Sequence, residues 1–305
     1  MHFTTPPKSE PVEFTTLDGL TLRGQLYAAS SRGPAVIMTP GWNCVKEMLL
    51  PEVAERFQAA GFTALTYDPR NLGESDGMPR NEIDPAKQVE DYSDALTYLS
   101  RHPMVDPSKI AFWGMSFSGS IAACAAALDK RAKVLISICP MTVFFTDEKR
   151  QKILSKAIMD RVSQLKGNRP FMLVPFTKTG ENPGGLAQGG GREAYEFMST
   201  VKDHGAPNYE NHTTIQSYYR MMMWQPWPLF EHVDPTPAMV LIPDGDQIAK
   251  PEDQRRMFDA LSGPKKLVFA RGKGHLNVLS GEDAEMLIQE QVEFMRDAFE
   301  GKPIS

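Results

Sequence analysis

The chain has 305 residues, of which 41% are hydrophobic and 23% are charged, and these values are typical of a soluble globular enzyme. The formal net charge is −5 and there is no long basic run, which argues against nucleic acid or an anionic membrane as the main partner. No segment approaches about 18 uninterrupted apolar residues, so the sequence predicts no membrane-spanning helix.

The first residues, MHFTTPPKSEPVEF, lack the apolar stretch of a signal peptide. Cys44, Cys124 and Cys139 stand in or beside apolar stretches and lack the spacing of metal ligands, which favours reduced, buried thiols. These features predict a cytoplasmic protein, and no residue pattern points to a metal or a redox cofactor.

Alternating residues on both sides of Asp18-Gly19 predict a β-hairpin over residues 12–28. After it, apolar runs typical of buried strands alternate with segments whose apolar residues recur every three or four positions, as in helices. The expected strands are residues 34–39, 62–67, 110–113 and 133–139, and the expected helices are residues 47–60, residues 84–99 and an alanine-rich segment after Gly119. Residues 68–77, DPRNLGESDG, are expected to form a structural or pocket-rim loop without a catalytic role.

This alternation stops at Pro140 and resumes about a hundred residues later. The elements expected from there are a strand at residues 238–242, a helix at residues 251–261, a strand at residues 266–270 and a final amphipathic helix. Strands alternating with helices imply an α/β fold with a mostly parallel central sheet and helices on both faces. We therefore expect a core of residues 1–140 and 233–305, with residues 141–232 inserted as a lid.

Within the insertion, residues 146–165 are expected to form one or two helices. The glycine-rich residues 180–191 lack the ending of a phosphate loop, which favours a flexible connection. Residues 221–227, MMMWQPW, are rich in methionine and tryptophan, and methionine adapts to irregular apolar shapes. This segment therefore either lines a pocket or attaches the insertion to the core. The candidate substrate-binding residues are Met222, Met223, Trp224 and Trp227.

The strand expected at residues 110–113 runs into GMSFSG, residues 114–119, with a helix directly behind it. A strand, a sharp turn that holds one serine, and a helix make up a nucleophile elbow, in which the serine hydroxyl projects above the sheet. The residues two positions from the serine must be small, because the strand and the helix nearly touch there. Ser118 departs from the common G-x-S-x-G pattern by one hydroxymethyl group. We predict that Ser116 is the nucleophile, against the alternative that so short a motif arose by chance.

A serine nucleophile needs a base, normally a histidine that is oriented by a carboxylate, and in this fold they follow in the order serine, acid, histidine. His275, in the motif GKGH, comes directly after the last expected strand and is the predicted base. Two carboxylates follow the strand at residues 238–242. Asp246 has the better position for the acid and Asp244 is the alternative, while a carboxylate here could also serve only to cap the helix at Pro251.

The oxyanion formed in acyl transfer needs two preorganised N–H donors. One is expected from Phe117, directly after the nucleophile at the start of a helix. The other is expected from Trp42, in the loop after the strand at residues 34–39, because Pro40 has no N–H group and Gly41 permits the required turn. Trp42 is alternatively a core residue, and the two roles are compatible.

Motifs along nearly the whole chain carry a family resemblance. They are DGLTLRG, TPGWNCVKEM, YDPRNLGESDG, AFWGMSFSG, LDKRAK and GKGHLNVLSG in the core, with QLKGNRPFML and GENPGG in the insertion. With them the chain resembles the α/β-hydrolase superfamily, and within it the dienelactone-hydrolase-like group that includes the fungal polyketide transferases. The resemblance implies a serine acyl-enzyme that carries a polyketide or related acyl group from a carrier-protein thioester to an alcohol or to water. The serine at position 118 of the elbow motif agrees with that group.

The sequence thus predicts serine-dependent acyl transfer or thioester hydrolysis in secondary-metabolite biosynthesis. Ser116 is the expected nucleophile, His275 the base and then the acid, and Asp246 the residue that orients it. The expected substrate is a hydrophobic polyketide acyl thioester presented by an acyl carrier protein. The alternatives are a small-molecule carboxylesterase or dienelactone-type hydrolase, and a non-catalytic binding protein on the same fold. The presence of all three residues argues against the last alternative.

Overall fold

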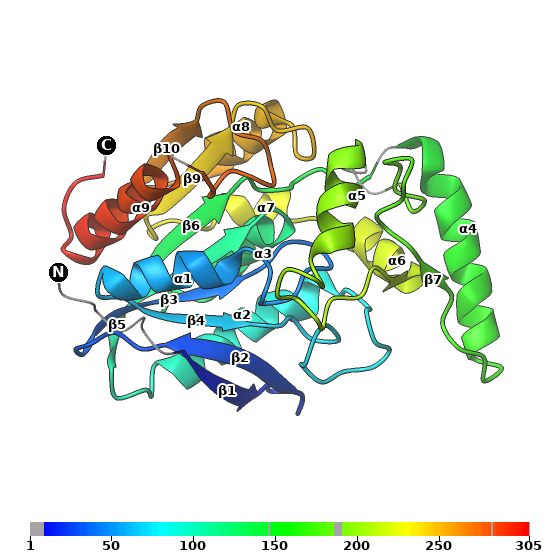
Figure 1. Cartoon of the computed structure of the whole chain (residues 1–305), viewed down its shortest axis with the longest axis horizontal. Helices are drawn as coiled ribbons and strands as arrows, with labels where there is room; N and C mark the ends of the chain where they lie inside the picture. The colour runs from blue at the N-terminus through cyan, green and yellow to red at the C-terminus, as the bar shows by residue number, and fades with distance from the viewer. Residues whose placement is uncertain (1–8, 146, 186–190, 282, 305) are drawn as a thin grey trace.

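The computed structural model describes residues 9–145, 147–185, 191–281 and 283–304. Within these residues an eight-stranded sheet has the order β1-β2-β4-β3-β5-β6-β9-β10 (Figure 1). The strands are β1 (Glu10–Thr15), β2 (Thr21–Tyr27), β3 (Gly33–Thr39), β4 (Thr63–Tyr67), β5 (Val105–Met115), β6 (Val134–Ile138), β9 (Ala238–Pro243) and β10 (Lys265–Ala270). Along the sheet from β4 to β10, neighbouring strands are parallel. Strands β1 and β2 form the predicted hairpin and are antiparallel to each other, and β2 is also antiparallel to β4. The predicted α/β fold with a mostly parallel sheet is confirmed.

Helices cover both faces of the sheet, and each face has its own apolar cluster. One cluster takes its helical residues from α2 (Pro85–Leu99), α3 (Phe117–Leu128), α7 (Trp227–Phe230) and α8 (Pro251–Ala260), and also from α4 (Asp147–Gln164) and α6 (Ile215–Met223). The other takes them from α1 (Leu50–Ala59) and α9 (Ala284–Phe299), which lie next to each other. This double cover explains why β4, β6 and β9 are buried at every residue, and β3 at all but its first two.

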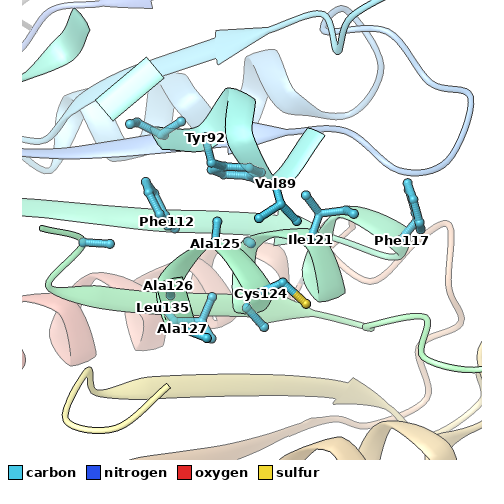
Figure 2. Packing of buried hydrophobic residues seen from close by; sticks show 14 of the residues in the cluster. Val89, Tyr92, Phe112, Phe117, Ile121, Cys124, Ala125, Ala126, Ala127 and Leu135 are labelled. Atoms are coloured by element: carbon cyan, nitrogen blue, oxygen red, sulfur yellow. The ribbon is translucent and has the colours of Figure 1, made fainter. Parts of the chain in front are cut away.

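Helix α3 packs closely on the sheet because most of its inner residues are alanine. Ala125 and its neighbours lie against Phe112 of β5 and Leu135 of β6 (Figure 2). Val89 and Tyr92 of α2 pack in the same cluster, with the ring centroids of Tyr92 and Phe112 5.0 Å apart. Tyr92 is also fixed by polar contacts, since its hydroxyl donates to the Trp113 carbonyl at 2.7 Å and lies 2.6 Å from the Thr39 hydroxyl. The strand and the helix that flank Ser116 are therefore both rigidly held.

The helix expected at residues 47–60 begins only at Leu50. Leu49 has a left-handed backbone with φ 65°, and the preceding loop is held by a contact from a distant part of the chain. The Lys46 backbone N–H donates to Asp68 Oδ1 at 2.7 Å, and the Lys46 ammonium lies 2.9 Å from Asp68 Oδ2. The helical spacing of apolar residues begins at Leu50, and residues 47–49 before it lie in a loop that this buried ion pair holds.

The segment between β6 and β9 forms helices and one short two-stranded pair, and most of it lies together beside the core (Figure 1). Its elements are α4 (Asp147–Gln164), β7 (Met172–Leu173), α5 (Gly191–Thr200), β8 (Thr213–Thr214), α6 (Ile215–Met223) and α7. The helix expected from residue 146 is the single helix α4; Thr146 and residues 186–190 of the expected glycine-rich connection lie outside the described residues. Helix α4 is 18 residues long but strongly charged, and no helix of the described chain has the length and apolar character of a membrane span.

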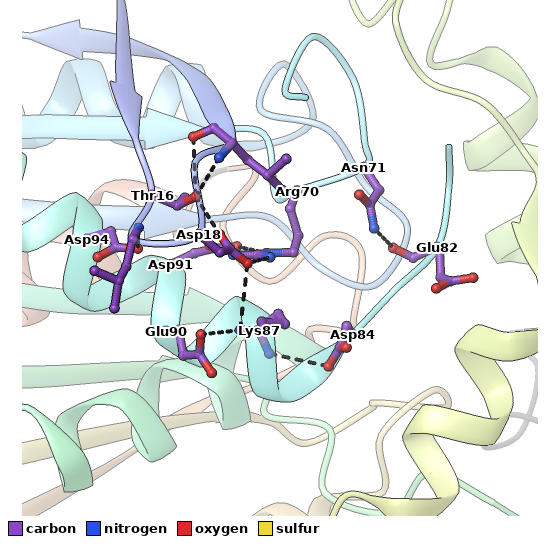
Figure 3. Close-up of polar contacts among 12 residues, drawn as sticks. Thr16, Asp18, Arg70, Asn71, Glu82, Asp84, Lys87, Glu90, Asp91 and Asp94 are labelled. Atoms are coloured by element: carbon purple, nitrogen blue, oxygen red, sulfur yellow. Dashed lines mark hydrogen bonds and ion pairs between the residues drawn. The ribbon is translucent and has the colours of Figure 1, made fainter. Parts of the chain in front are cut away.

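The loop expected to be structural, residues 68–77, anchors the hairpin to α2 through Arg70 (Figure 3). Arg70 Nε and Nη2 donate to the two oxygens of Asp91 at 2.9 and 2.5 Å, and Nη1 donates to Asp18 at 2.8 Å. Asp18 belongs to the hairpin turn, where it also accepts from Thr16, and the hydrogen bond from Arg70 holds the pKa of Asp18 well below its usual range. The guanidinium thus connects three segments that are distant in sequence.

Replacing Arg70 by alanine is expected to lower the free energy of unfolding by about 3–5 kcal/mol, because it leaves the buried carboxylate of Asp91 without its partner. Arg192→Ala is the matched control. Arg192 pairs with Glu196 one helical turn away, but both side chains are largely exposed, so its loss should cost less than about 1 kcal/mol. Urea unfolding followed by circular dichroism measures both values, and equal losses would contradict a structural role for Arg70.

Candidate active site

Ser116 lies in the turn between β5 and α3 with a strained backbone, at φ 60° and ψ −124°. Its N–H donates to the Ile138 carbonyl at 2.8 Å, which ties the turn to β6. A Cβ atom on Gly114 would lie 2.0 Å from the Ser118 carbonyl oxygen, so only glycine allows the strand and the helix to approach this closely. This is the geometry of a nucleophile elbow.

Ser118, where the common pattern has glycine, makes a contact that glycine cannot make. Its hydroxyl donates to the carbonyl of Pro40, in the loop that follows β3. A Cβ atom on Gly41 would lie 3.3 Å from the Ser116 Cβ and 3.7 Å from its hydroxyl oxygen, so this loop passes directly over Ser116. The hydroxyl of Ser118 therefore joins the elbow to the loop that faces it.

Trp42 and Phe117 are both brought next to Ser116. Phe117 is the first residue of α3, so its N–H has no acceptor within the helix. Trp42 follows Gly41 in the loop over Ser116, and its buried ring packs on Phe176 and Tyr218. Trp42 is thus a core residue, and its position also suits the predicted oxyanion donor.

His275 and Asp246 form a buried pair with a 2.7 Å distance between Nδ1 and Oδ2. Oδ1 of Asp246 accepts from the N–H groups of Ile248 and Ala249 at 2.8 and 2.9 Å, and Oδ2 also accepts from Gln254 at 2.8 Å. An ionised carboxylate only accepts hydrogen bonds, so Nδ1 of His275 must carry the proton. Nε2 of the neutral ring is therefore the nitrogen that can take a proton from another group.

Asp244, the alternative acid, has a different partner. Its Oδ1 accepts from the N–H of Gly272 at 2.7 Å, and the Gly245 N–H donates to the Lys273 carbonyl at 2.9 Å. Both contacts join the loop after β9 to the loop that carries His275. Asp244 thus shapes the histidine loop, while Asp246 contacts the histidine itself.

The electrostatic environment of His275 favours its protonated form. Burial disfavours the charged imidazolium, but hydrogen bonds with Asp246 and Cys139 and the charge of Asp246 favour it, and the balance raises the pKa of His275 above its ordinary value of 6.5. Burial also raises the pKa of Cys139, so its sulfur is a neutral thiol at neutral pH. The negative charge beside His275 is therefore that of Asp246.

Ser116 and His275 line the same pocket, a narrow apolar cavity of about 70 Å³. Ser116, His275 and Asp246 are 8%, 6% and 3% exposed. Most of the wall is apolar, and Asn182 is a polar exception. The apolar wall consists of Pro40, Gly41, Trp42, Cys44, Met48, Leu49, Leu50, Met115, Met141, Phe176, Phe197, Met198, Ile248 and Leu276.

Helix α5 forms one side of this pocket and packs against the loop that passes over Ser116. A separate small cluster joins them, made of Cys44, Val45 and Met48 from the loop with Met198, Val201, Ala206 and Tyr209 from α5 and the residues after it. Phe197 and Met198 of α5 also line the pocket. The inserted segment and the loop after β3 thus form one wall.

The four candidate residues of the insertion do not line this pocket. Met222, Trp224 and Trp227 border a separate cavity of about 180 Å³, and Met223 is 60% exposed. The Trp224 ring packs on Phe117 and Phe144, with centroids 5.7 and 5.2 Å apart. This segment therefore borders a cavity of its own and also attaches the insertion to the first turn of α3, so it combines the two roles considered for it.

Several residues around the pocket were not identified from the sequence. Gln254 holds the carboxylate of Asp246, and Cys139 lies beside His275 with a left-handed backbone at φ 38°. Met48, Met115 and Met198 line the pocket, but they lie in three separate segments and carry no local signal. Only the folded chain brings them together.

The model of a family described as the alpha/beta hydrolase family matches residues 36–289. The chain belongs to this family. A thiohydrolase of Eupenicillium brefeldianum is 52% identical over 286 residues, which cover 93% of each chain. A polyketide transferase of Stachybotrys chlorohalonatus is 50% identical over 288 residues, or 94% of this chain and 96% of its own.

Two solved structures are similar over nearly their whole length. The structure of DcsB in complex with its substrate analogue has 49% sequence identity and a TM-score of 0.93, covering 95% of this chain and 100% of the other. The α/β hydrolase GrgF from Penicillium has 41% identity and a TM-score of 0.88, covering 96% and 99%. The resemblance to the fungal polyketide transferases is confirmed, and these relatives support a role in hydrolysis or acyl transfer.

Proposed function

We propose that the protein transfers or hydrolyses acyl thioesters through a covalent ester on Ser116. The observation that carries this proposal is that His275, which is paired with the buried Asp246, lines the same apolar pocket as Ser116. The pair leaves Nε2 of His275 as the basic nitrogen, and a serine hydroxyl becomes a good nucleophile when such a base takes its proton.

In the first step His275 takes the Ser116 proton while Oγ attacks the thioester carbonyl carbon. The N–H groups of Trp42 and Phe117 stabilise the oxyanion, the carbon–sulfur bond breaks, and His275 gives the proton to the leaving sulfur. In the second step His275 takes a proton from an alcohol or a water molecule, which attacks the ester carbon. The bond to Ser116 then breaks and the serine regains its proton.

The proposed substrate is a polyketide or similar hydrophobic acyl group presented as a thioester by an acyl carrier protein. The apolar pocket wall and the names of the relatives, which are thiohydrolases and polyketide transferases, support this choice. A cytoplasmic location is part of the proposal, and the three buried free cysteines are compatible with it.

The experiment is intact-protein mass spectrometry after mixing with a medium-chain acyl N-acetylcysteamine thioester, with and without an alcohol. A mass gain equal to the acyl group is expected, and its decay in alcohol against water distinguishes a transferase from a hydrolase. If there is neither an adduct nor released thiol at several chain lengths, and a fluorophosphonate also fails to label the protein, the proposed function is wrong.

The rate of acylation is expected to rise with pH through a midpoint above 6.5, because only the neutral ring of His275 accepts a proton and its pKa is raised. Initial thiol release between pH 6 and 9 gives this profile as kcat/KM, after subtraction of the uncatalysed hydrolysis. A rate that is already constant at pH 6 would contradict the raised pKa.

A further inference from the structure

Three polar side chains lie together at the otherwise largely apolar wall of the Ser116 pocket, and we call them the polar site. Trp42 and Asn182 both line the pocket. The ring of Tyr218 packs on the ring of Trp42, with centroids 5.7 Å apart, and its hydroxyl lies close to the Asn182 side chain. The polar site thus joins the loop after β3 to two separate parts of the insertion.

The Asn182 side chain is held so that its NH₂ group is available. Its Oδ1 accepts from the N–H of Gly184 at 2.8 Å, and its backbone carbonyl accepts from the Lys149 ammonium at 3.3 Å. A Cβ atom on Gly184 would lie 2.0 Å from the Tyr218 ring, so this turn packs closely on the ring. The Tyr218 hydroxyl makes no hydrogen bond of acceptable geometry with the amide. The NH₂ group, which can only donate, therefore remains open to a molecule in the pocket.

Two further polar groups beside Asn182 lack a partner. The indole Nε1 of Trp42 and the hydroxyl oxygen of Tyr218 are buried, and among the described residues neither has a hydrogen bond of acceptable geometry. Trp42 is 5% exposed and Tyr218 is 0% exposed. A polar group that stays unpaired in a protein interior is costly, and native proteins rarely leave one there without a reason. These two groups therefore favour a ligand that brings an acceptor to this wall.

The chemistry of the three groups defines the ligand atom that suits them. An indole N–H and an amide NH₂ only donate, and a tyrosine hydroxyl can donate as well. A carbonyl oxygen accepts two hydrogen bonds and brings no proton that would itself need a partner. A carboxylate suits the site less well, because the described residues that line the pocket include neither lysine nor arginine.

We propose that the polar site binds a keto oxygen carried by the acyl chain itself, apart from the thioester carbonyl. The NH₂ group of Asn182 makes the main contact, and the Trp42 indole and the Tyr218 hydroxyl support it. The protein then prefers keto-bearing acyl chains over fully reduced ones, because a methylene group in this place leaves the donors unpaired. This inference rests on the proposed function and adds which acyl chains the same site accepts.

The test uses N-acetylcysteamine thioesters of one ten-carbon acyl chain, either unmodified or with a keto group at one carbon between 3 and 9. At the position that reaches the polar site, kcat/KM for thiol release is expected to be at least about tenfold above that of the unmodified chain. The uncatalysed hydrolysis of each thioester is subtracted.

Variants assign this preference to the polar site. In Asn182→Leu, which is similar in size but apolar, the preference should fall to about threefold or less. Tyr218→Phe keeps the ring and removes only the hydroxyl, and it should lower the preference at least about twofold. Asn168→Leu is the matched control, since Asn168 is exposed after α4 and donates to Ser163, outside the pocket; it should keep the full preference.

The preference is a ratio measured on one protein, so a general loss of rate or of folded protein cancels, and thermal unfolding identifies any folding defect. Equal kcat/KM for the unmodified chain and every keto chain, or a preference that Asn182→Leu and Tyr218→Phe both keep in full, overturns the inference and leaves the proposed function standing. If no thioester is turned over and a fluorophosphonate does not label the protein, the proposed function is overturned and the inference falls with it.

Discussion

Replacing Ser116 by alanine is expected to reduce kcat/KM for an acyl thioester by at least about 10⁴-fold and to abolish the acyl adduct. The variant lacks the oxygen that forms the ester, while the pair of His275 and Asp246 remains. Thiol release gives the kinetic loss, and labelling with a fluorophosphonate gives an independent readout. The fold should be preserved, because the backbone contact of residue 116 with Ile138 needs no side chain.

Ser118→Ala is the matched control, since it removes a buried hydroxyl two residues away. It loses the hydrogen bond to the Pro40 carbonyl but keeps the nucleophile. We expect it to be labelled and to form the adduct, at a reduced rate because the loop over Ser116 is held less firmly. If Ser118→Ala lost labelling and Ser116→Ala kept it, the nucleophile would have to be reassigned.

Asp246→Asn is expected to cost about 10⁴-fold in the rate of acylation, a loss of the size found when the acid of a triad becomes an amide. The amide oxygen has to stay where Oδ1 accepts the N–H groups of Ile248 and Ala249. The NH₂ group then faces His275 and Gln254, which both donate to Oδ2 in the wild type. Nδ1 of His275 must give up its proton to accept from this NH₂, and Nε2 no longer serves as the base.

Asp244→Asn is the control for this change. Its amide oxygen can still accept from Gly272, so the histidine loop keeps its position and the loss should stay below about tenfold. Pre-steady-state thiol release measures both variants. The reverse order, with Asp244→Asn the more damaged, would make Asp244 the acid.

Elements with local signals were predictable from the sequence. The hairpin at Gly19, the buried strands and the elbow all depend on residues close together in the chain, and each was found. The start of α1 was not, because the contact between Lys46 and Asp68 that keeps residues 47–49 in a loop joins residues 22 positions apart. A tertiary contact of this kind overrides the helix propensity of the local sequence.

The residues of the candidate site also divide into those with a local sequence signal and those that depend on distant contacts. Ser116 and His275 each follow a strand end, which a sequence reveals. The geometry favours Asp246 over Asp244 only through contacts with His275 and Gly272, about 30 residues away. The role of Trp224 was likewise hidden, because composition indicates that a residue is apolar but not which cavity or ring it faces.

The shared wall formed by α5 and the loop after β3 has a consequence for how this enzyme can diversify. Met198 both lines the pocket and packs into the cluster with Cys44 and Met48, in the loop that also contains Trp42. A substitution on α5 that makes room for a longer chain will therefore also move the loop over Ser116. Changes of chain-length preference and of reaction rate should arise together in this protein, and an engineer who widens the pocket at α5 will need a compensating change in residues 40–49.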